Sequence, residues 1–232
     1  MVIRSILFYA FLSVWTILMG IICLPYLFVS NSHIRKPINF WILGIFKLLE
    51  IICNITHEIR GGENIPNYSV LIASKHQSAF ETFALFFYLK KSIFIHKTQL
   101  LFIPIFGQYL KKTNMISINR SEGTAAMRKM LREAKSKMAA GYSIIIFPEG
   151  TRKKPGDPPD YKSGFVGIYK ETKAQILPIA VNSGKCWPKH TWIKQPGHIT
   201  IQLLKTIPSG LNRSKILNKV EIIIENKTKE IN

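Results

Sequence analysis

The chain opens on a long apolar stretch. No charged residue occurs from Ser5 to Ser30. A helix rises about 1.5 Å per residue, so a helix over this stretch exceeds the roughly 30 Å hydrocarbon core of a bilayer. Trp15, Tyr9 and Tyr26 are suited to the membrane interface. A cleaved signal peptide would have a shorter apolar core and a small-residue cleavage site. We therefore expect a retained hydrophobic helical membrane anchor.

A second apolar stretch, Ile38–Ile55, contains Lys47 and Glu50 and is less suited to crossing a bilayer. It fits a second span, an interfacial helix or a cover on the core. Arg35 and Lys36 separate the two stretches, and basic residues beside a short apolar hairpin tend to stay cytoplasmic. Two helices dipping into one leaflet fit this pattern as well as one span does.

After Gly61 and Gly62 the pattern changes to short β-branched runs that alternate with longer helical patterns. Most runs are continuously apolar, as expected for strands covered on both faces. This predicts an α/β fold, with a central mostly parallel or mixed sheet flanked by helices. We divide the chain into residues 1–56, the membrane-associated helical segment or segments, and residues 57–232, the α/β domain. The predicted strands are Val70–Ser74, Ile93–His96, Met115–Ile118, Ser143–Phe147, Gln175–Val181 and Ile199–Leu203.

The clearest predicted helix runs from Gly123 to Ala140. Its apolar face repeats at spacings of four, three and four residues, and basic residues fill much of the remainder. Further helices are predicted at Ala79–Lys90, Pro104–Lys111 and Arg213–Lys227. The proline-rich segment Lys153–Asp160 is predicted to be a loop.

Charge and cysteine content narrow the possible partners. The 232 residues have a formal net charge of +19. Apart from a merely solvated basic surface, this excess suits nucleic acid, an anionic lipid surface, an acidic carrier protein or a phosphorylated substrate. A nucleic-acid-binding module would interleave aromatic with basic residues, and none is recognisable. Cys23, Cys53 and Cys186 form no CxxC pair, so neither a disulfide framework nor a zinc site is indicated.

The first candidate cluster is His76 and Glu81, just after the predicted strand Val70–Ser74. Ligand sites in α/β sheets gather at the carboxyl ends of strands. A carboxylate about one turn along can fix the tautomer of a histidine and stabilise its imidazolium. The pair therefore suits a general base that takes a proton from an alcohol. A surface His and a surface Glu that happen to be close fit the pattern too.

Two further clusters lie at predicted strand ends. In Phe147–Arg152 a strand runs into Pro, Glu, Gly, Thr and Arg. Arg152 can bind a phosphate through two parallel hydrogen bonds, and Gly150 permits close backbone approach. Glu149 is suited to accept from a substrate hydroxyl or to orient the arginine. An Arg–Glu pair in solvent is the alternative. The third cluster ends in Arg120, and an exposed charge at a strand end is its plainer interpretation.

Together these residues resemble the glycerolipid acyltransferase family, in particular its bacterial 1-acylglycerol-3-phosphate acyltransferases. The family has four ordered blocks, and the match covers about residues 60–182. Phe147–Arg152 reproduces its FPEGTR block without a substitution. The other blocks match at His76 with Glu81, at Arg120 and at Leu177–Ile179. The resemblance departs from the family where Glu81 replaces the usual Asp, and in the residues before Arg120.

The resemblance implies acyl transfer from an acyl thioester, on coenzyme A or an acyl carrier protein, to the sn-2 hydroxyl of 1-acyl-sn-glycerol-3-phosphate. This lysophosphatidic acid would become phosphatidic acid, in phospholipid biosynthesis. Another lysophospholipid, a lyso-aminolipid or glycerol-3-phosphate is the alternative acceptor. His76 would be the base and Glu81 its support. Arg120 and Arg152 would bind the phosphate.

The same resemblance implies that Glu149, Gly150 and Thr151 shape the phosphate pocket, with a backbone N–H near Gly150 as one candidate oxyanion donor. No GxSxG elbow surrounds Ser78, so direct transfer is expected rather than an acyl-enzyme. No HExxH motif indicates a metal. No cofactor beyond the acyl donor and no nucleic-acid partner are expected. The expected place is the bacterial inner or plasma membrane, with the catalytic domain cytoplasmic and membrane lipids as partners.

Overall fold

The computed structural model describes residues 1–103 and 106–232, and the side chains of Ser32 and Arg120 are outside that description. In the described part of the chain one sheet contains β1 (Ile55–Arg60), β2 (Leu71–Ser74), β3 (Ser92–Lys97), β4 (Ile116–Ile118), β5 (Ser143–Ile146), β6 (Ile176–Val181) and β7 (Gly197–Leu203). The α-helices are α1 (Val2–Ile22), α2 (Arg35–Cys53), α3 (Phe80–Tyr88), α4 (Phe106–Lys111), α5 (Gly123–Ala139), α6 (Gly164–Thr172) and α7 (Arg213–Glu230).

The sheet is mixed, with the strand order β1-β7-β6-β2-β5-β3-β4. All neighbouring strands are parallel except β6 and β7, so β1 and β7 run opposite to the other five. The fold class expected from the sequence is confirmed. Each strand predicted there is present within one or two residues of its expected bounds.

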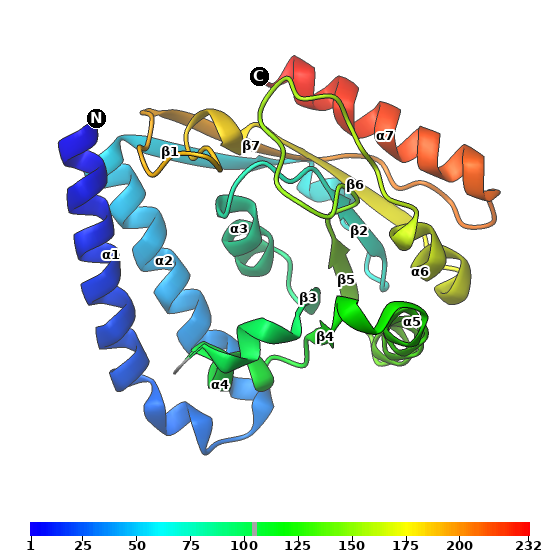
Figure 1. Cartoon of the computed structure of the whole chain (residues 1–232), viewed down its shortest axis with the longest axis horizontal. Helices are drawn as coiled ribbons and strands as arrows, with labels where there is room; N and C mark the ends of the chain where they lie inside the picture. Colours follow the sequence, from blue (N-terminus) through cyan, green and yellow to red (C-terminus); the bar gives the residue numbers. More distant parts are fainter. Residues whose placement is uncertain (104–105) are drawn as a thin grey trace.

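Helices cover both faces of the sheet (Figure 1). On one face, α2 and α3 pack Ile45, Leu49 and Leu85 into a buried cluster with strand residues. On the other face, α5, α6 and α7 form a second buried cluster. Because the central strands are buried between two helical layers, their side chains are apolar on both sides.

The two N-terminal helices form an antiparallel hairpin (Figure 1). A Cβ on Gly44 of α2 would overlap the indole ring of Trp15, so glycine permits this close approach. The indole Nε1 of Trp15 donates to the carbonyl of Trp41 at 2.9 Å. α2 buries its inner face in the core, as the interpretation of this stretch as a cover on the core expects.

α1 is a candidate membrane span by length and composition. Over 18 residues its mean hydropathy is 2.1, and only 22% of these residues are buried. Its outer face leaves Ile3, Val14 and Ile17 at least 60% exposed. A core helix of a soluble protein would bury such side chains, so this surface suits contact with lipid.

Two elements were missed by the sequence patterns. β1 lies at the sheet edge and has polar residues at four of its six positions, and its apolar start at Ile55 continues the apolar stretch of α2, which ends at Cys53. α6 is short and follows the proline-rich loop, and its signal is four buried residues within five positions. The proposed boundary at 56/57 falls inside β1, and the division into two domains stays a prediction. Of the predicted helix Pro104–Lys111, residues 104 and 105 lie outside the described residues.

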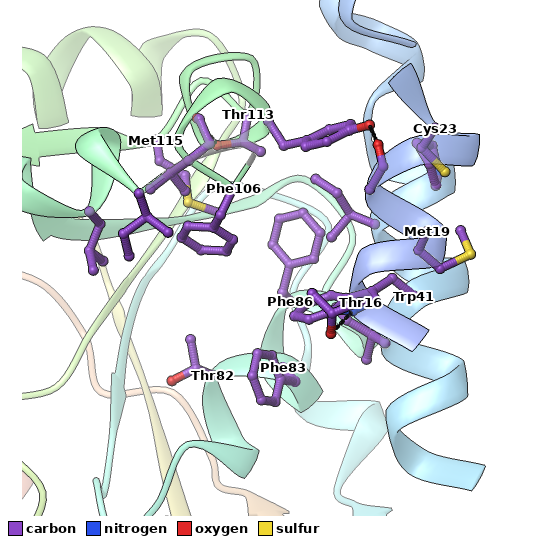
Figure 2. Close-up of a pocket in the computed structure, with 18 of the residues that line it drawn as sticks. Thr16, Met19, Cys23, Trp41, Thr82, Phe83, Phe86, Phe106, Thr113 and Met115 are labelled. Atoms are coloured by element: carbon purple, nitrogen blue, oxygen red, sulfur yellow. Dashed lines mark hydrogen bonds between the residues drawn. The ribbon is translucent and has the colours of Figure 1, made fainter. Parts of the chain in front are cut away.

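An apolar cavity of about 390 Å³ lies between the α1–α2 hairpin and the segment from α3 to β4 (Figure 2). Met19 and Cys23 of α1 line one side, and Thr82 and Phe83 of α3 line another. Tyr109 of α4 also lines it and joins α4 to α1 by donating to the carbonyl of Gly20 at 3.0 Å. The hairpin is thus both a cover on the core and one wall of a space beside α3.

Candidate active site

The candidate residues lie at one edge of the sheet because β2, β4, β5 and β6 are mutually parallel. Their carboxyl ends therefore meet at that edge. The first cluster follows β2, the Arg120 turn follows β4, and the FPEGTR segment follows β5. The end of β6 adds a further polar residue, Ser183, which the sequence patterns did not single out.

The imidazole of His76 contacts the carboxylate of Glu81. His76 Nδ1 lies 2.9 Å from Glu81 Oε1. A carboxylate only accepts, so Nδ1 is assigned the proton and Nε2 keeps its lone pair. The His76 side chain is 16% exposed, whereas Glu81 is fully buried in the first turn of α3. The ring is thus held from inside the protein while Nε2 stays free to meet a substrate.

Glu81 accepts four further hydrogen bonds. The amides of Gln77 and Ser78 donate to Oε1 at 2.6 and 2.7 Å. The hydroxyls of Ser78 and Ser183 donate to Oε2 at 2.8 and 2.6 Å. Burial raises the pKa of Glu81, but the hydrogen bond and charge of His76, with these donors, hold it below its ordinary value. The carboxylate is therefore ionised and fixed, as support for an imidazolium requires. The longer side chain of Glu reaches His76 here in the place where Asp is usual.

Phe147 supports the other side of the histidine. Its ring stacks on that of His76 with centroids 3.8 Å apart. Phe147 also stacks on Phe94, which lines the apolar cavity. Phe147 and Phe94 thus form a continuous series of aromatic contacts from His76 to the cavity.

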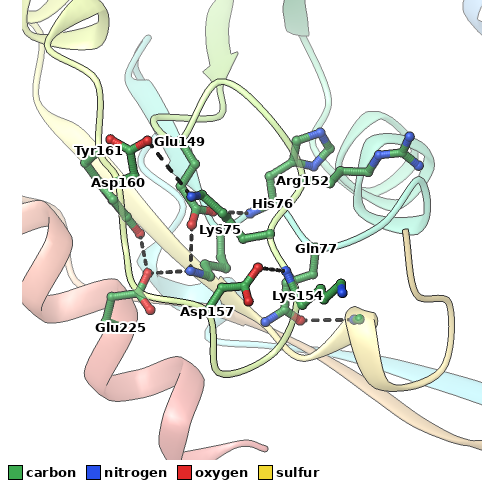
Figure 3. Close-up of polar contacts among 12 residues, drawn as sticks. Lys75, His76, Gln77, Glu149, Arg152, Lys154, Asp157, Asp160, Tyr161 and Glu225 are labelled. Atoms are coloured by element: carbon green, nitrogen blue, oxygen red, sulfur yellow. Dashed lines mark hydrogen bonds and ion pairs between the residues drawn. The ribbon is translucent and has the colours of Figure 1, made fainter. Parts of the chain in front are cut away.

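Glu149 occupies a different place from the one expected. It is 1% exposed, and its Oε1 accepts from Lys75 Nζ at 2.7 Å (Figure 3). Its Oε2 accepts from the backbone N–H of His76 at 3.2 Å. Both oxygens are engaged inside the protein. In this structure Glu149 therefore supports the main chain of the histidine loop, and its expected part in shaping the phosphate pocket stays a prediction.

Gly150 has a φ of +65°, and a Cβ there would meet nothing closer than 3.9 Å. The glycine is thus required by its left-handed conformation and not by close approach. Its amide donates to the carbonyl of Phe147 at 2.9 Å, so the Gly150 amide itself is not free to stabilise an oxyanion. Thr151 is exposed, and its hydroxyl accepts from Lys189 Nζ at 3.1 Å.

Arg152 is half-buried and lies beside His76 in the loop after β5 (Figure 3). The carbonyl of His76 accepts from the amide of Lys153 at 2.8 Å, which joins the two loops. Lys189 Nζ donates to the carbonyl of Arg152 at 3.0 Å. Arg120 begins a 3-10 turn after β4, and its side chain lies outside the described residues. Among described residues, no group of three His, Cys, Asp or Glu is placed to hold a metal ion.

The profile of a family described as "Acyltransferase" matches residues 56–182, which contain His76, Glu81 and the FPEGTR segment. The chain belongs to the acyltransferase family.

Named relatives support this membership. The acyltransferase is 34% identical over 205 residues to the 1-acyl-sn-glycerol-3-phosphate acyltransferase of Pseudomonas aeruginosa, covering 86% of this chain and 78% of the relative. It is 27% identical to the enzyme of that name from Cocos nucifera, covering 90% and 67%. The crystal structure of the 1-acyl-sn-glycerophosphate (LPA) acyltransferase PlsC from Thermotoga maritima superposes with a TM-score of 0.80. That comparison covers 99% of this chain and 95% of the other at 23% identity, and it shows a shared fold.

The acyltransferase has supporting residues outside its recognisable motifs. Ser183 begins the turn that follows β6, one residue beyond the matched region, and its signal is a polar residue two positions after a buried strand. Gln77 Oε1 accepts from the amide of Gly184 at 3.0 Å and ties the same segment to the histidine loop. Lys75 is buried beside His76, although a lysine before a histidine predicts only an exposed charge.

Proposed function

We propose that this acyltransferase moves an acyl group from an acyl thioester to the sn-2 hydroxyl of 1-acyl-sn-glycerol-3-phosphate, forming phosphatidic acid. The observation that supports it most is the 2.9 Å contact between His76 Nδ1 and Glu81 Oε1. It leaves the His76 Nε2 lone pair for the acceptor hydroxyl. The names of the relatives support the choice of acceptor.

In the proposed reaction His76 Nε2 takes the proton of the hydroxyl as its oxygen attacks the thioester carbonyl. Glu81 stabilises the imidazolium that forms. The tetrahedral intermediate collapses, the carbon–sulfur bond breaks, and the imidazolium returns its proton to the leaving sulfur. The products are phosphatidic acid and a free thiol. No covalent acyl-enzyme is needed, because the base and the acceptor act directly on the donor.

Two binding regions complete the proposal. Arg152, in the loop joined to that of His76, would bind the acceptor phosphate together with Arg120, which begins the turn after the parallel strand β4. The cavity beside Phe94 is apolar and suits an acyl chain. Phe94, which lines it, stacks on Phe147, and Phe147 stacks on the proposed base His76.

We also propose that α1 anchors the enzyme in the bacterial inner or plasma membrane, with the sheet domain on the cytoplasmic side. The exposed apolar face of α1 and the basic residues Arg35 and Lys36 after it support this orientation. All three cysteines are free and buried, which agrees with a reducing compartment. The donor is acyl-CoA or an acyl carrier protein. Lys154 is exposed and suits contact with an acidic donor. Lys162 is less available for such a contact, because it pairs with Asp160 at 2.6 Å.

The test is phosphatidic acid formation by membranes containing the wild type, His76→Ala or His190→Ala. Loss of the base should lower the rate by about 10²–10⁴-fold. His190 is exposed and serves as the matched control, which should retain the wild-type rate. If the wild type acylates another lysolipid but not 1-acyl-sn-glycerol-3-phosphate, the proposed acceptor is wrong. Equal rates for His76→Ala and the wild type would show that His76 is not the base.

A further inference from the structure

A buried polar group connects α7 to the loop that contains His76 (Figure 3). Lys75 Nζ lies 2.7 Å from Glu149 Oε1 and 2.7 Å from Glu225 Oε1 of α7. The hydroxyl of Tyr161 donates to the same Glu225 oxygen at 3.0 Å. The side chains of Lys75, Glu149 and Glu225 are 3%, 0% and 14% exposed. These four residues, the Lys75 cluster, lie almost entirely out of water.

Charges buried in this way are a poor source of stability, because apolar residues of similar shape often serve as well. A cluster in which each partner has several hydrogen bonds does fix one conformation of the groups it joins. Burial raises the pKa of Glu149, whereas the ammonium of Lys75 favours its charged form. Lys75 in turn depends on Glu225, which Tyr161 holds in place.

The cluster acts on the proposed base through the main chain. Glu149 Oε2 accepts from the backbone N–H of His76 at 3.2 Å. Glu225, Lys75, Glu149 and the His76 amide therefore form a continuous series of contacts from α7 to the histidine loop. If Lys75 shifted, Glu149 would lose its partner and its hydrogen bond to the His76 backbone N–H would weaken. The position of the His76 imidazole depends on that backbone.

We propose that Glu225 and Lys75 are positioning residues of the acyltransferase: from α7 they hold Glu149 against the His76 main chain and so set the geometry of the base. The inference rests on the proposed role of His76. Glu225 lies far outside the matched family region, so its part in the reaction follows from the tertiary contacts alone. A displacement of about 1 Å at a reacting group can cost about 100-fold in rate.

The experiment compares Glu225→Leu with Glu230→Leu in the protein held in membranes or detergent. Glu230 lies at the exposed end of α7, away from the Lys75 cluster, and makes the matched control. Glu225→Leu should lower kcat by about 10- to 100-fold, with KM for the acceptor changed little. Hydrogen–deuterium exchange of the peptide containing the His76 amide should become faster. The control should leave both readouts near wild type.

Tyr161→Phe removes only the hydroxyl bond to Glu225 and should cause a smaller change in the same readouts, with Tyr169→Phe of α6 as its control. If Glu225→Leu does not fold, the comparison of Tyr161→Phe with Tyr169→Phe tests the positioning role instead. In the Lys75→Met variant, the added substitution Glu225→Leu should lower kcat little further, because both residues act on His76 through Glu149. Wild-type kcat and unchanged exchange in Glu225→Leu and Tyr161→Phe would overturn the positioning role. Absent wild-type turnover would overturn the proposed function, and amide exchange would still decide whether the cluster holds His76.

Discussion

The imidazole of His76 lies almost parallel to the ring of Phe147, with the two planes inclined by 14°. Its Nδ1 edge is held by Glu81, so the stacked ring limits the remaining freedom of the imidazole to tilt. The orientation of the proposed base is thus set by one hydrogen bond and one aromatic face.

Replacing the aromatic face tests this orientation. Phe147→Leu keeps an apolar side chain but removes the flat surface under His76. Aromatic pairs contribute about 0.5–1.5 kcal/mol beyond burial, so we expect kcat to fall about three- to tenfold. The measurement is kcat at saturating donor and acceptor. Phe102→Leu, at a residue that is 80% exposed, should keep the wild-type kcat. A wild-type kcat for Phe147→Leu would contradict the orienting role.

The ionised Glu81 predicts a pH dependence of stability. Its pKa is lower in the folded protein than its ordinary value of 4.5, because the hydrogen bonds and charge of His76 and its other donors outweigh burial. The stabilisation is therefore fully present above pH 4.5 and is lost as the pH falls through the lower folded-state pKa. The difference in unfolding free energy between wild type and Glu81→Gln should shrink over that range.

Urea unfolding in detergent at a series of acidic pH values checks this prediction. Glu230→Gln changes an exposed carboxylate on α7 and controls for general charge effects. A constant difference between wild type and Glu81→Gln across the acidic range would show that the Glu81 carboxylate is not held ionised by the fold.

Ser183 should matter although it lies beyond the recognisable motifs. Ser183→Ala removes the donor 2.6 Å from Glu81 Oε2. A hydrogen bond to a charged group contributes about 1.5–3 kcal/mol, so the free energy of unfolding should fall by about that amount. We expect kcat to fall as well, since Glu81 is held less firmly. Chemical denaturation and initial rates measure the two effects. Ser209→Ala, at an exposed position, should change neither quantity. If Ser183→Ala also changes neither, Ser183 does not support Glu81.

Arg152 should act through the acceptor phosphate. Arg152→Lys keeps the charge but loses the planar fork that binds two phosphate oxygens, so KM for the lysophosphatidic acid should rise about tenfold or more. The same variant should treat 1-acylglycerol, which has no phosphate, as the wild type does. Arg128→Lys, at an exposed position of α5, is the matched control. An equal loss with both acceptors would argue against a phosphate contact.

The apolar cavity predicts a preference for acyl-chain length. Cys23→Trp adds volume inside the cavity and should lower kcat/KM for long-chain donors more than for short-chain donors. Overpacking costs about 1–3 kcal/mol where side chains cannot move, which corresponds to roughly 5- to 150-fold. Ile51→Trp places the same group on the exposed side of α2 and should leave the ratio unchanged. An unchanged ratio for Cys23→Trp would show that the acyl chain lies elsewhere.

Several features followed from local patterns. The continuous apolar runs indicated strands such as β2 and β6 because strands buried on both faces need apolar side chains throughout. The 3.6-residue period indicated α5. The uncharged stretch indicated α1. β1 was missed because an edge strand that is partly exposed alternates weakly and follows a helix without a break.

Residue type, order and spacing are enough to single out the candidates for the chemistry, which are His76, Glu81 and the FPEGTR segment. Tertiary structure decided what each of them contacts. Glu149 and Lys75 are charged and read as exposed or substrate-facing, yet Glu225, 150 positions from Lys75, completes a buried cluster with them. Ser183 reaches Glu81 across 102 positions. Only the packing of β2 beside β5 and β6, with α7 over them, brings such distant groups together, because no local pattern records a contact between residues far apart in the chain.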